Sequence, residues 1–236
     1  MKIGVVTFPG SNCDSDARYA STLTGNETVQ LWHKDTSLPA GLDVVILPGG
    51  FSYGDYLRTG AIARFSPIMN AVTTFANDGG LVFGICNGFQ ILCESGLLPG
   101  ALIRNANLSF VCKDVYLRVE NTSSAFTNTV KPSSVLRVPV AHGDGRFTAP
   151  QDVIDGLEAN GQVLYRYTTP DGAVTKEANP NGSMNNIAGI INASGNVMGL
   201  MPHPERACEP LVGSSDGVSV FESLAVHVGL SSAVSA

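Results

Sequence analysis

The sequence predicts an α/β fold with a single doubly wound, mostly parallel sheet, flanking helices and an extra β-rich hairpin region in its second half. Three observations predict it. Short apolar runs recur through the first half, each bounded by Gly or Pro. The runs are continuously apolar rather than alternating, which is typical of strands buried on both faces. Helical stretches fit between the runs, the order expected of a doubly wound sheet.

In the first half, the apolar runs have the length of strands and are rich in Val, Ile, Leu or Phe; they cover residues 2–8, 28–33, 43–47 and 81–85. Helices are predicted at residues 14–23, 61–77 and 87–94. The first follows a Pro-Gly-Ser-Asn loop with polar residues available for capping. The second has apolar residues near helical spacing and ends before Gly79 and Gly80, and the third stops at Gly96.

The second half is less regular. Strands are predicted at residues 115–119, 136–140, 163–167, 187–191 and 197–201. Residues 171–186 are polar and rich in Gly, Pro and Asn, so we expect a long hairpin or flap there, and a closing helix at 215–228. No linker composition separates the halves, and we expect one domain over residues 1–236.

Composition excludes several classes of function. The formal charge is −6 and no Lys/Arg cluster occurs, which argues against a nucleic-acid partner. No apolar run approaches the roughly 18 residues that a membrane span needs, and the amino terminus enters a strand at once instead of a signal peptide. The five cysteines are scattered without metal-ligand spacing, so we expect no metal site and a reducing, cytoplasmic setting.

The segment Gly84-Ile85-Cys86-Asn87-Gly88 follows a buried strand and opens a helix. This is the pattern of a nucleophile elbow, with Cys in place of Ser. Such a sharp turn crowds the backbone, so small residues are needed two positions before and after the nucleophile. The helix amino terminus favours negative charge on the Cys86 sulfur, and the Asn87 N–H is placed to stabilise an oxyanion. The alternative is a buried structural Cys in a glycine-rich turn; the strand before and the helix after favour the functional interpretation.

The other cysteines lack an elbow. Cys93 falls within the helix after Cys86 and is expected to pack in the core, and three more are expected to be structural or incidental: Cys13, Cys112 and Cys208.

Four histidines are candidates for the base that a thiol nucleophile needs. His203 lies in Met201-Pro202-His203-Pro204-Glu205, where the residue before proline is pushed into extended backbone, so that His203 and Glu205 face one side. The alternative is a proline-rich turn with a surface His and Glu. His142 is the second choice as base; its glycine-flanked loop, Gly143 included, suits substrate contact better. His33 and His227 are expected to be structural or surface residues.

The strand at 43–47 runs into Pro48-Gly49-Gly50-Phe51. Bare backbone N–H groups of Gly49 and Gly50 would lie at the same sheet edge as Cys86, where glycine allows close approach of a substrate. An ordinary strand-ending turn is the alternative.

Leu-Pro-Gly-Gly, Gly-Ile-Cys-Asn-Gly-Phe-Gln and Pro-His-Pro-Glu, in this order, resemble the class I (triad) glutamine amidotransferases. Longer motifs are similar to members that act as separate glutaminase subunits of a purine-biosynthetic synthase; the likeness runs from Met1 to about Leu230, and the motifs that carry it are residues 8–14, 49–56, 60–65, 86–92, 139–143 and 202–207. The resemblance implies Cys86 as nucleophile, with His203 and Glu205 completing the triad.

The same resemblance implies that the Gly50 and Asn87 N–H groups form the oxyanion hole. Glutamine would also contact Gly49, Phe51, Gln90, His142 and Gly143. The implied partner is an ATP-dependent synthase subunit, with a further small subunit; because the chain has no P-loop, we expect no cofactor here and ATP and Mg²⁺ on the partner. Two alternatives stay open: a glutaminase serving another synthase or a related γ-glutamyl hydrolase, and a non-catalytic interaction protein on the same fold.

Overall fold

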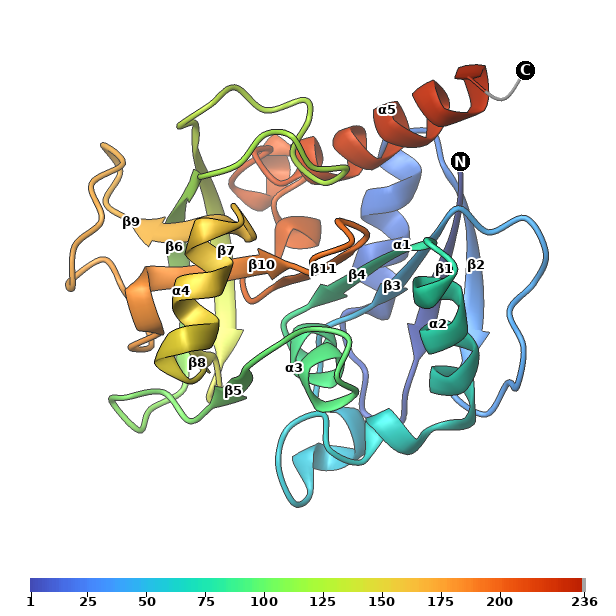
Figure 1. The fold of residues 1–236 in the computed structure, drawn as a ribbon, viewed down its shortest axis with the longest axis horizontal. Coiled ribbons are helices and arrows are strands. Elements are labelled where there is room, and N and C mark those ends of the chain that lie inside the picture. The colour runs from blue at the N-terminus through green and yellow to red at the C-terminus, as the bar shows by residue number, and fades with distance from the viewer. Residues whose placement is uncertain (235–236) are drawn as a thin grey trace.

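The computed structural model describes residues 1–234. Its centre is a nine-stranded sheet in the order β2-β1-β3-β4-β11-β10-β9-β6-β7 (Figure 1). The strands are β1 Lys2–Thr7, β2 Glu27–Trp32, β3 Val44–Leu47, β4 Leu81–Ile85, β6 Val111–Val119, β7 Val135–His142, β9 Val163–Thr168, β10 Ile187–Ile191 and β11 Val197–Leu200. Strands from both halves of the sequence therefore share one sheet.

The first five strands of this order pair in parallel, from β2 to β11. Every residue of β3, β4 and β11 is buried, as the continuously apolar runs predicted. Helices α1 (Asp14–Leu23) and α5 (Val218–Val234) cover one face, and α2 (Pro67–Asn77) and α3 (Asn87–Glu94) cover the other (Figure 1). The predicted doubly wound α/β fold is confirmed.

The remaining four strands are antiparallel and extend the sheet beyond β11. The long β6–β7 pair, which joins Val111 to His142 at one end and Arg118 to Val135 at the other, supplies the expected β-rich hairpin region. A small second sheet pairs β5 (Ala101–Ile103) with β8 (Arg146–Thr148), and α4 (Gln151–Ala159) follows β8. None of these three short elements was expected from the sequence.

The predicted helix at 61–77 is shorter in the structure. A 3-10 turn occupies Ala63–Phe65, and α2 begins only at Pro67. Ser66 has φ −60° and ψ 138°, the extended backbone that a following proline imposes. Pro67 therefore separates two helical segments that the apolar spacing had predicted as one helix. Proline is favourable at the first position of a helix, which Pro67 occupies in α2.

Of the hairpin or flap expected at 171–186, the hairpin is wrong. This segment contains no strand and only a 3-10 turn, Met184–Asn186. Asparagine side chains take the place of ladder hydrogen bonds: Asn179 Nδ2 donates to the Ser183 carbonyl (2.8 Å) and Asn186 Nδ2 to the Thr175 carbonyl (2.7 Å). The segment is a loop held by side-chain amides.

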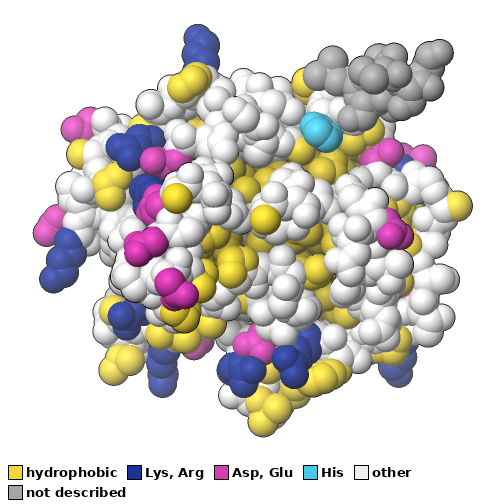
Figure 2. Space-filling model, in the orientation of Figure 1, with side chains coloured by type: hydrophobic (Ala, Val, Ile, Leu, Met, Phe, Trp, Pro, Cys, Tyr) yellow, Lys and Arg dark blue, Asp and Glu magenta, His cyan; other side chains and the backbone are white. Residues whose placement is uncertain are grey.

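In Figure 2 the charged side chains lie mainly along the left and lower edges of the molecule, and hydrophobic side chains are visible across the centre of this face. Among residues 1–234, no helix combines the length and the apolarity that crossing a bilayer requires.

Gly88 marks the closest approach of α3 to the sheet, and we predict that Gly88→Ala destabilises the fold. A Cβ there would lie 1.9 Å from the Leu47 carbonyl oxygen. We expect the free energy of unfolding to fall by about 3 kcal/mol, the upper part of the range for overpacked cores. Urea unfolding followed by circular dichroism measures it.

The matched control is Gly156→Ala in the middle of α4, where an added Cβ meets nothing within 4 Å. This substitution should raise the free energy of unfolding by about 1 kcal/mol, because alanine is the better helix former. Equal unfolding midpoints for the two variants would contradict the packing argument.

Candidate active site

Cys86 sits between β4 and α3 in a strained turn. Its φ is 49° and its ψ −103°, a backbone conformation that non-glycine residues rarely adopt. A Cβ at Gly84 would lie 2.7 Å from the Gly88 carbonyl carbon, and one at Gly88 would strike β3. Larger residues at these two positions would therefore open the turn, which is the reason the elbow needs glycine on both sides.

His203 and Glu205 meet at the end of β11, in and beside the 3-10 turn Pro204–Arg206. His203 Nδ1 donates to Glu205 Oε1 at 2.6 Å, and the two residues are only 2% and 5% exposed. The His203 N–H donates to the Pro139 carbonyl of β7 at 2.9 Å. The two side chains share one side as expected, although Glu205 reaches His203 through a 3-10 turn and not through extended chain.

The charges around His203 decide its protonation. Burial by itself would lower the pKa of the imidazole, but the charges of Glu205 and Cys86 together raise that pKa well above its ordinary value. His203 Nε2 is buried and has no hydrogen-bond partner within the described chain. With Nδ1 fixed by Glu205, Nε2 is the nitrogen left to exchange a proton.

The segment 49–51 lies against both His203 and the loop after β1. A Cβ at Gly49 would be 2.7 Å from His203 Cε1, and one at Gly50, where φ is 139°, would be 2.8 Å from Ser11 Cα. The Phe51 N–H donates to the Gly10 carbonyl at 2.9 Å. These contacts fix the backbone that was predicted to supply one oxyanion donor.

Asn87, the first residue of α3, connects this segment to the elbow. Its backbone N–H is one of the helix-terminal donors without an intrahelical acceptor. Its side-chain Oδ1 accepts from the Ser52 N–H at 3.2 Å, and its Nδ2 donates to Gln90 Oε1 at 2.9 Å. The two predicted oxyanion segments are thus joined by one amide side chain.

Gln90, His142 and Gly143 come together beyond the elbow. Gln90 Nε2 donates to the Asp144 carbonyl at 2.7 Å. His142 is buried, with Nδ1 3.1 Å from Asn105 Oδ1 and Nε2 3.4 Å from Asn181 Nδ2. Burial, helped by the charge of His203, lowers the pKa of His142 to about 4. His142 therefore stays neutral and holds the shape of the 143–145 loop.

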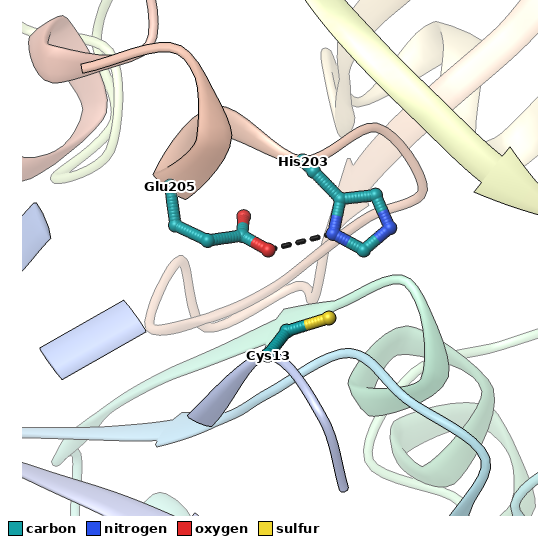
Figure 3. A group of neighbouring side chains, drawn as sticks. All are labelled: Cys13, His203 and Glu205. Carbon is teal, nitrogen blue, oxygen red and sulfur yellow. Dashed lines mark hydrogen bonds and ion pairs between the residues drawn. The ribbon is translucent and has the colours of Figure 1, made fainter. Parts of the chain in front are cut away.

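Cys13 was expected to be structural or incidental, but the structure places its sulfur beside the His203–Glu205 pair (Figure 3). Ligand atoms of these three residues all lie within 4.8 Å of one another. Groups at this spacing can bind a metal ion. Arg206, however, donates to the Cys13 sulfur at 3.0 Å, and its positive charge disfavours a cation beside that sulfur. The position of Cys13 in the sequence could have indicated this proximity, because Cys13 follows β1 at the sheet edge that also carries Cys86.

This fold and this elbow define a class. Residues 1–217 match the model of the CobB/CobQ-like glutamine amidotransferase domain, and the chain belongs to that family. The family assignment agrees with the thiol elbow and the buried His–Glu pair.

Individual relatives are more specific. The chain is 61% identical to "Phosphoribosylformylglycinamidine synthase subunit PurQ" of Salinibacter ruber, over 97% of both chains. It is 58% identical to the subunit of the same name from Moorella thermoacetica, over 95% of both chains. Among solved structures, "Structure of PurLQS from Thermotoga maritima" superposes with a TM-score of 0.85 at 45% identity, covering 96% of this chain and 98% of that one.

A glutamine amidotransferase of Thermotoga maritima, 15% identical, superposes with a TM-score of 0.56 over 88% of this chain and 77% of its own. At that identity the likeness shows the shared fold alone.

We predict that His142 makes stability depend on pH. Because burial depresses its pKa in the folded state to about 4, the unfolded chain takes up the proton first as pH falls below about 6.5. The His142 contribution should cost about 2 kcal/mol of unfolding free energy between pH 7 and pH 5. Urea unfolding at both pH values measures it, and His142→Asn should show a correspondingly smaller difference between them. An unchanged difference in that variant would mean that His142 is not the group responsible.

Proposed function

We propose that this chain is the glutaminase subunit of phosphoribosylformylglycinamidine synthase. It hydrolyses glutamine to glutamate and ammonia, and the ammonia serves the ATP-dependent conversion of formylglycinamide ribonucleotide to formylglycinamidine ribonucleotide in purine biosynthesis. One observation carries the chemistry: a strained elbow presents Cys86 close to the buried His203–Glu205 pair. The nearly full-length likeness to PurQ subunits supports the choice of synthase.

In the first half of the reaction, the Cys86 thiolate attacks the side-chain carboxamide carbon of glutamine. The negative charge that develops on the carboxamide oxygen is stabilised by the backbone N–H groups of Gly50 and Asn87. His203 then gives its Nε2 proton to the departing ammonia as the C–N bond breaks, which leaves a glutamyl thioester on Cys86.

In the second half, His203 Nε2 takes a proton from water, and the resulting hydroxide attacks the thioester. The C–S bond breaks, glutamate leaves and the Cys86 thiolate returns. Glu205 keeps the imidazole oriented and stabilises its charged form throughout, a role that the short Nδ1–Oε1 bond supports. His142 is the weaker candidate for base, because Asn105 and Asn181 contact both of its ring nitrogens.

The partners follow from this division of labour. The acceptor synthesis takes place on a synthase subunit that binds ATP and Mg²⁺, assisted by a further small subunit, and this chain itself carries no cofactor. Phe51 and Tyr56, 45% and 74% exposed, flank the active-site segment and suit contact with that partner. Tyr53 does not, because its hydroxyl is bonded to His33 and Ser66 of this chain. We propose a cytoplasmic location for the complex.

The test of the proposal is Cys86→Ala in the assembled synthase. We expect glutamine-dependent synthesis to be lost while synthesis from ammonium salts continues at the wild-type rate, because only the ammonia source is removed. Product formation with each nitrogen source measures this. Cys112→Ala, at an exposed cysteine on β6, is the matched control and should leave both activities unchanged. Retention of glutamine hydrolysis by Cys86→Ala would rule out the thioester route.

Substitutions of His203, Glu205 and His142 should lower glutaminase activity to different extents. His203→Ala should lower kcat for glutamine on the order of 10⁶-fold and Glu205→Gln on the order of 10⁴-fold, as in a triad where the orienting acid matters less than the base. His142→Ala should mainly raise KM, because it loosens the loop that carries Gly143. Steady-state glutaminase kinetics separate these effects, and a larger kcat loss for His142→Ala than for His203→Ala would transfer the base role.

A further inference from the structure

The peptide group between Gly49 and Gly50 carries the proposed oxyanion donor, the Gly50 N–H. The described chain contains no cis peptide bond, so the C=O and the N–H of this peptide point in opposite directions. Its carbonyl accepts from the Cys13 N–H at 3.3 Å, whereas its N–H has no acceptor within residues 1–234. The bond from Cys13 therefore fixes the direction of a donor that is left available for an oxyanion.

The glycine pair does not hold this orientation by itself. Gly50 has φ 139°, a conformation that residues other than glycine rarely adopt. Glycine on both sides of a peptide allows that peptide to rotate with little steric hindrance. It keeps one orientation only if neighbouring groups impose it.

The side chain of Cys13 lies against Gly49, next to the imidazole of His203. A Cβ at Gly49 would be 2.7 Å from His203 Cε1 and 3.0 Å from Cys13 Sγ. Figure 3 shows the sulfur below the His203–Glu205 pair in this view. Gly49 is therefore in contact with the base and with the Cys13 sulfur at once, and the sulfur fills space into which its backbone could otherwise move.

Two hydrogen bonds hold the Cys13 sulfur in place. Arg206 donates to it at 3.0 Å and donates through Nε to the Asp16 carboxylate at 3.1 Å. The Cys13 S–H donates to Asn12 Oδ1 at 3.0 Å. Cys13 is only 2% exposed, and burial raises the pKa of its thiol, so the thiol stays protonated. A neutral, buried thiol suits a structural contact and not a second nucleophile.

The backbone of Cys13 is anchored as firmly as its side chain. The Cys13 carbonyl accepts from the Ala17 N–H at 2.9 Å, the first hydrogen bond of α1. Asp16, which holds Arg206, lies in the first turn of the same helix. The start of α1 is therefore a fixed support from which Cys13 reaches both the glycine pair and the base.

We propose that Cys13 is a positioning residue for glutamine hydrolysis, because it orients the Gly49–Gly50 peptide. Its N–H fixes the carbonyl of that peptide, and its sulfur, held by Arg206, keeps Gly49 against the imidazole of His203. The proposal rests on the function proposed above and adds the residue that aligns the oxyanion donor with the base. Cys13 itself takes no part in the bond changes.

The consequence is a loss of kcat and not of substrate binding. In Cys13→Ala the space beside Gly49 is empty, and the freed peptide spends most of its time with the Gly50 N–H turned away. This donor acts on charge that develops in the transition state, so KM should change little. We expect kcat to fall about 10-fold, less than the roughly 10²–10³-fold that removal of an oxyanion donor costs.

Cys13→Ser is the conservative variant. Its hydroxyl keeps a buried atom that accepts from Arg206, so most of the lost kcat should return. If Cys13→Ser were as slow as Cys13→Ala, the bond from Arg206 would not be what holds the side chain, and the proposal would be overturned.

Steady-state glutamine hydrolysis by the chain assembled with its synthase subunit measures kcat and KM. Ser21→Ala is the matched control, because it removes one buried side-chain atom from α1 about two turns beyond Cys13. It should leave kcat unchanged. A Cys13→Ala effect confined to KM, or a kcat loss of equal size in Ser21→Ala, would show general loosening instead of positioning and would contradict the proposal.

Nuclear magnetic resonance observes the peptide directly and does not depend on activity. The sequence contains two Gly-Gly pairs, at 49–50 and 79–80. Glycine labelled with ¹³C at its carbonyl and ¹⁵N at its amide therefore gives carbonyl-coupled amide signals from Gly50 and Gly80 alone. Gly79→Asn removes the second pair and identifies the two signals; φ at Gly79 is 91°, which Asn tolerates.

In the full-length wild-type chain we expect one sharp signal from each pair. In Cys13→Ala the Gly50 signal should split or broaden, because the peptide now exchanges between two orientations, while the Gly80 signal stays sharp. A single sharp Gly50 signal in Cys13→Ala would overturn the proposal whether or not the chain hydrolyses glutamine. Absence of glutaminase activity in the wild-type complex would instead overturn the proposed function, and a split or broadened Gly50 signal would still support the positioning role of Cys13.

Discussion

The contact between the β4–α3 elbow and the end of β3 is the constraint on which the site depends. Gly88 lies so close to the Leu47 carbonyl that no side chain fits between them. This proximity brings α3 down onto the sheet, forces Cys86 into positive φ and places Asn87 within hydrogen-bonding distance of Ser52. Nucleophile, helix-terminal donors and the segment after β3 are therefore positioned by one backbone approach, and the strain at Cys86 is sustained by burial around it.

The proposed base, His203, lies in the second half of the sequence, whereas Cys86 lies in the first. The backbone of His203 is tied to Pro139 of β7, so the antiparallel strands as well as β11 position the imidazole. Its pairing with Glu205 in a buried setting costs desolvation, which the mutual charge of the pair and of Cys86 offsets. Cys13, which directly precedes α1, and Arg206, in the 3-10 turn after β11, lie beside the same pair. Arg206 donates both to the Cys13 sulfur and to the Asp16 carboxylate of α1.

The sequence correctly predicted those elements of the fold whose structure follows from residues close together in the chain. Continuous apolarity identified the parallel strands, and the spacing of Gly84, Cys86 and Gly88 identified the elbow. Local pattern failed where neighbours along the chain compete, as Pro67 shows by interrupting a helical apolar spacing. It also failed at 171–186, where asparagine side chains hold a loop and no strand forms. The neighbours of Cys13 and Asp55 could not be read from local pattern, because His203 beside Cys13 and Asp144 on the cavity that Asp55 lines are more than 80 positions away in the sequence.

Buried polar atoms without a hydrogen-bond partner link the fold to the proposed chemistry. Buried polar atoms are normally paired within a fold. Among the side chains that the structure describes, the buried atoms without a partner lie at the triad and on the Ser52–Asp55 turn, and the Asn87 side chain links that turn to the elbow. The same backbone segment carries Gly50, whose N–H is proposed to stabilise the oxyanion. The Asn87 side chain braces this segment at Ser52, and the carbonyls of Pro9 and Gly10 brace it at Tyr53 and Phe51. The proposed oxyanion donor is therefore positioned by the fold before a substrate binds, as electrostatic stabilisation of a transition state requires.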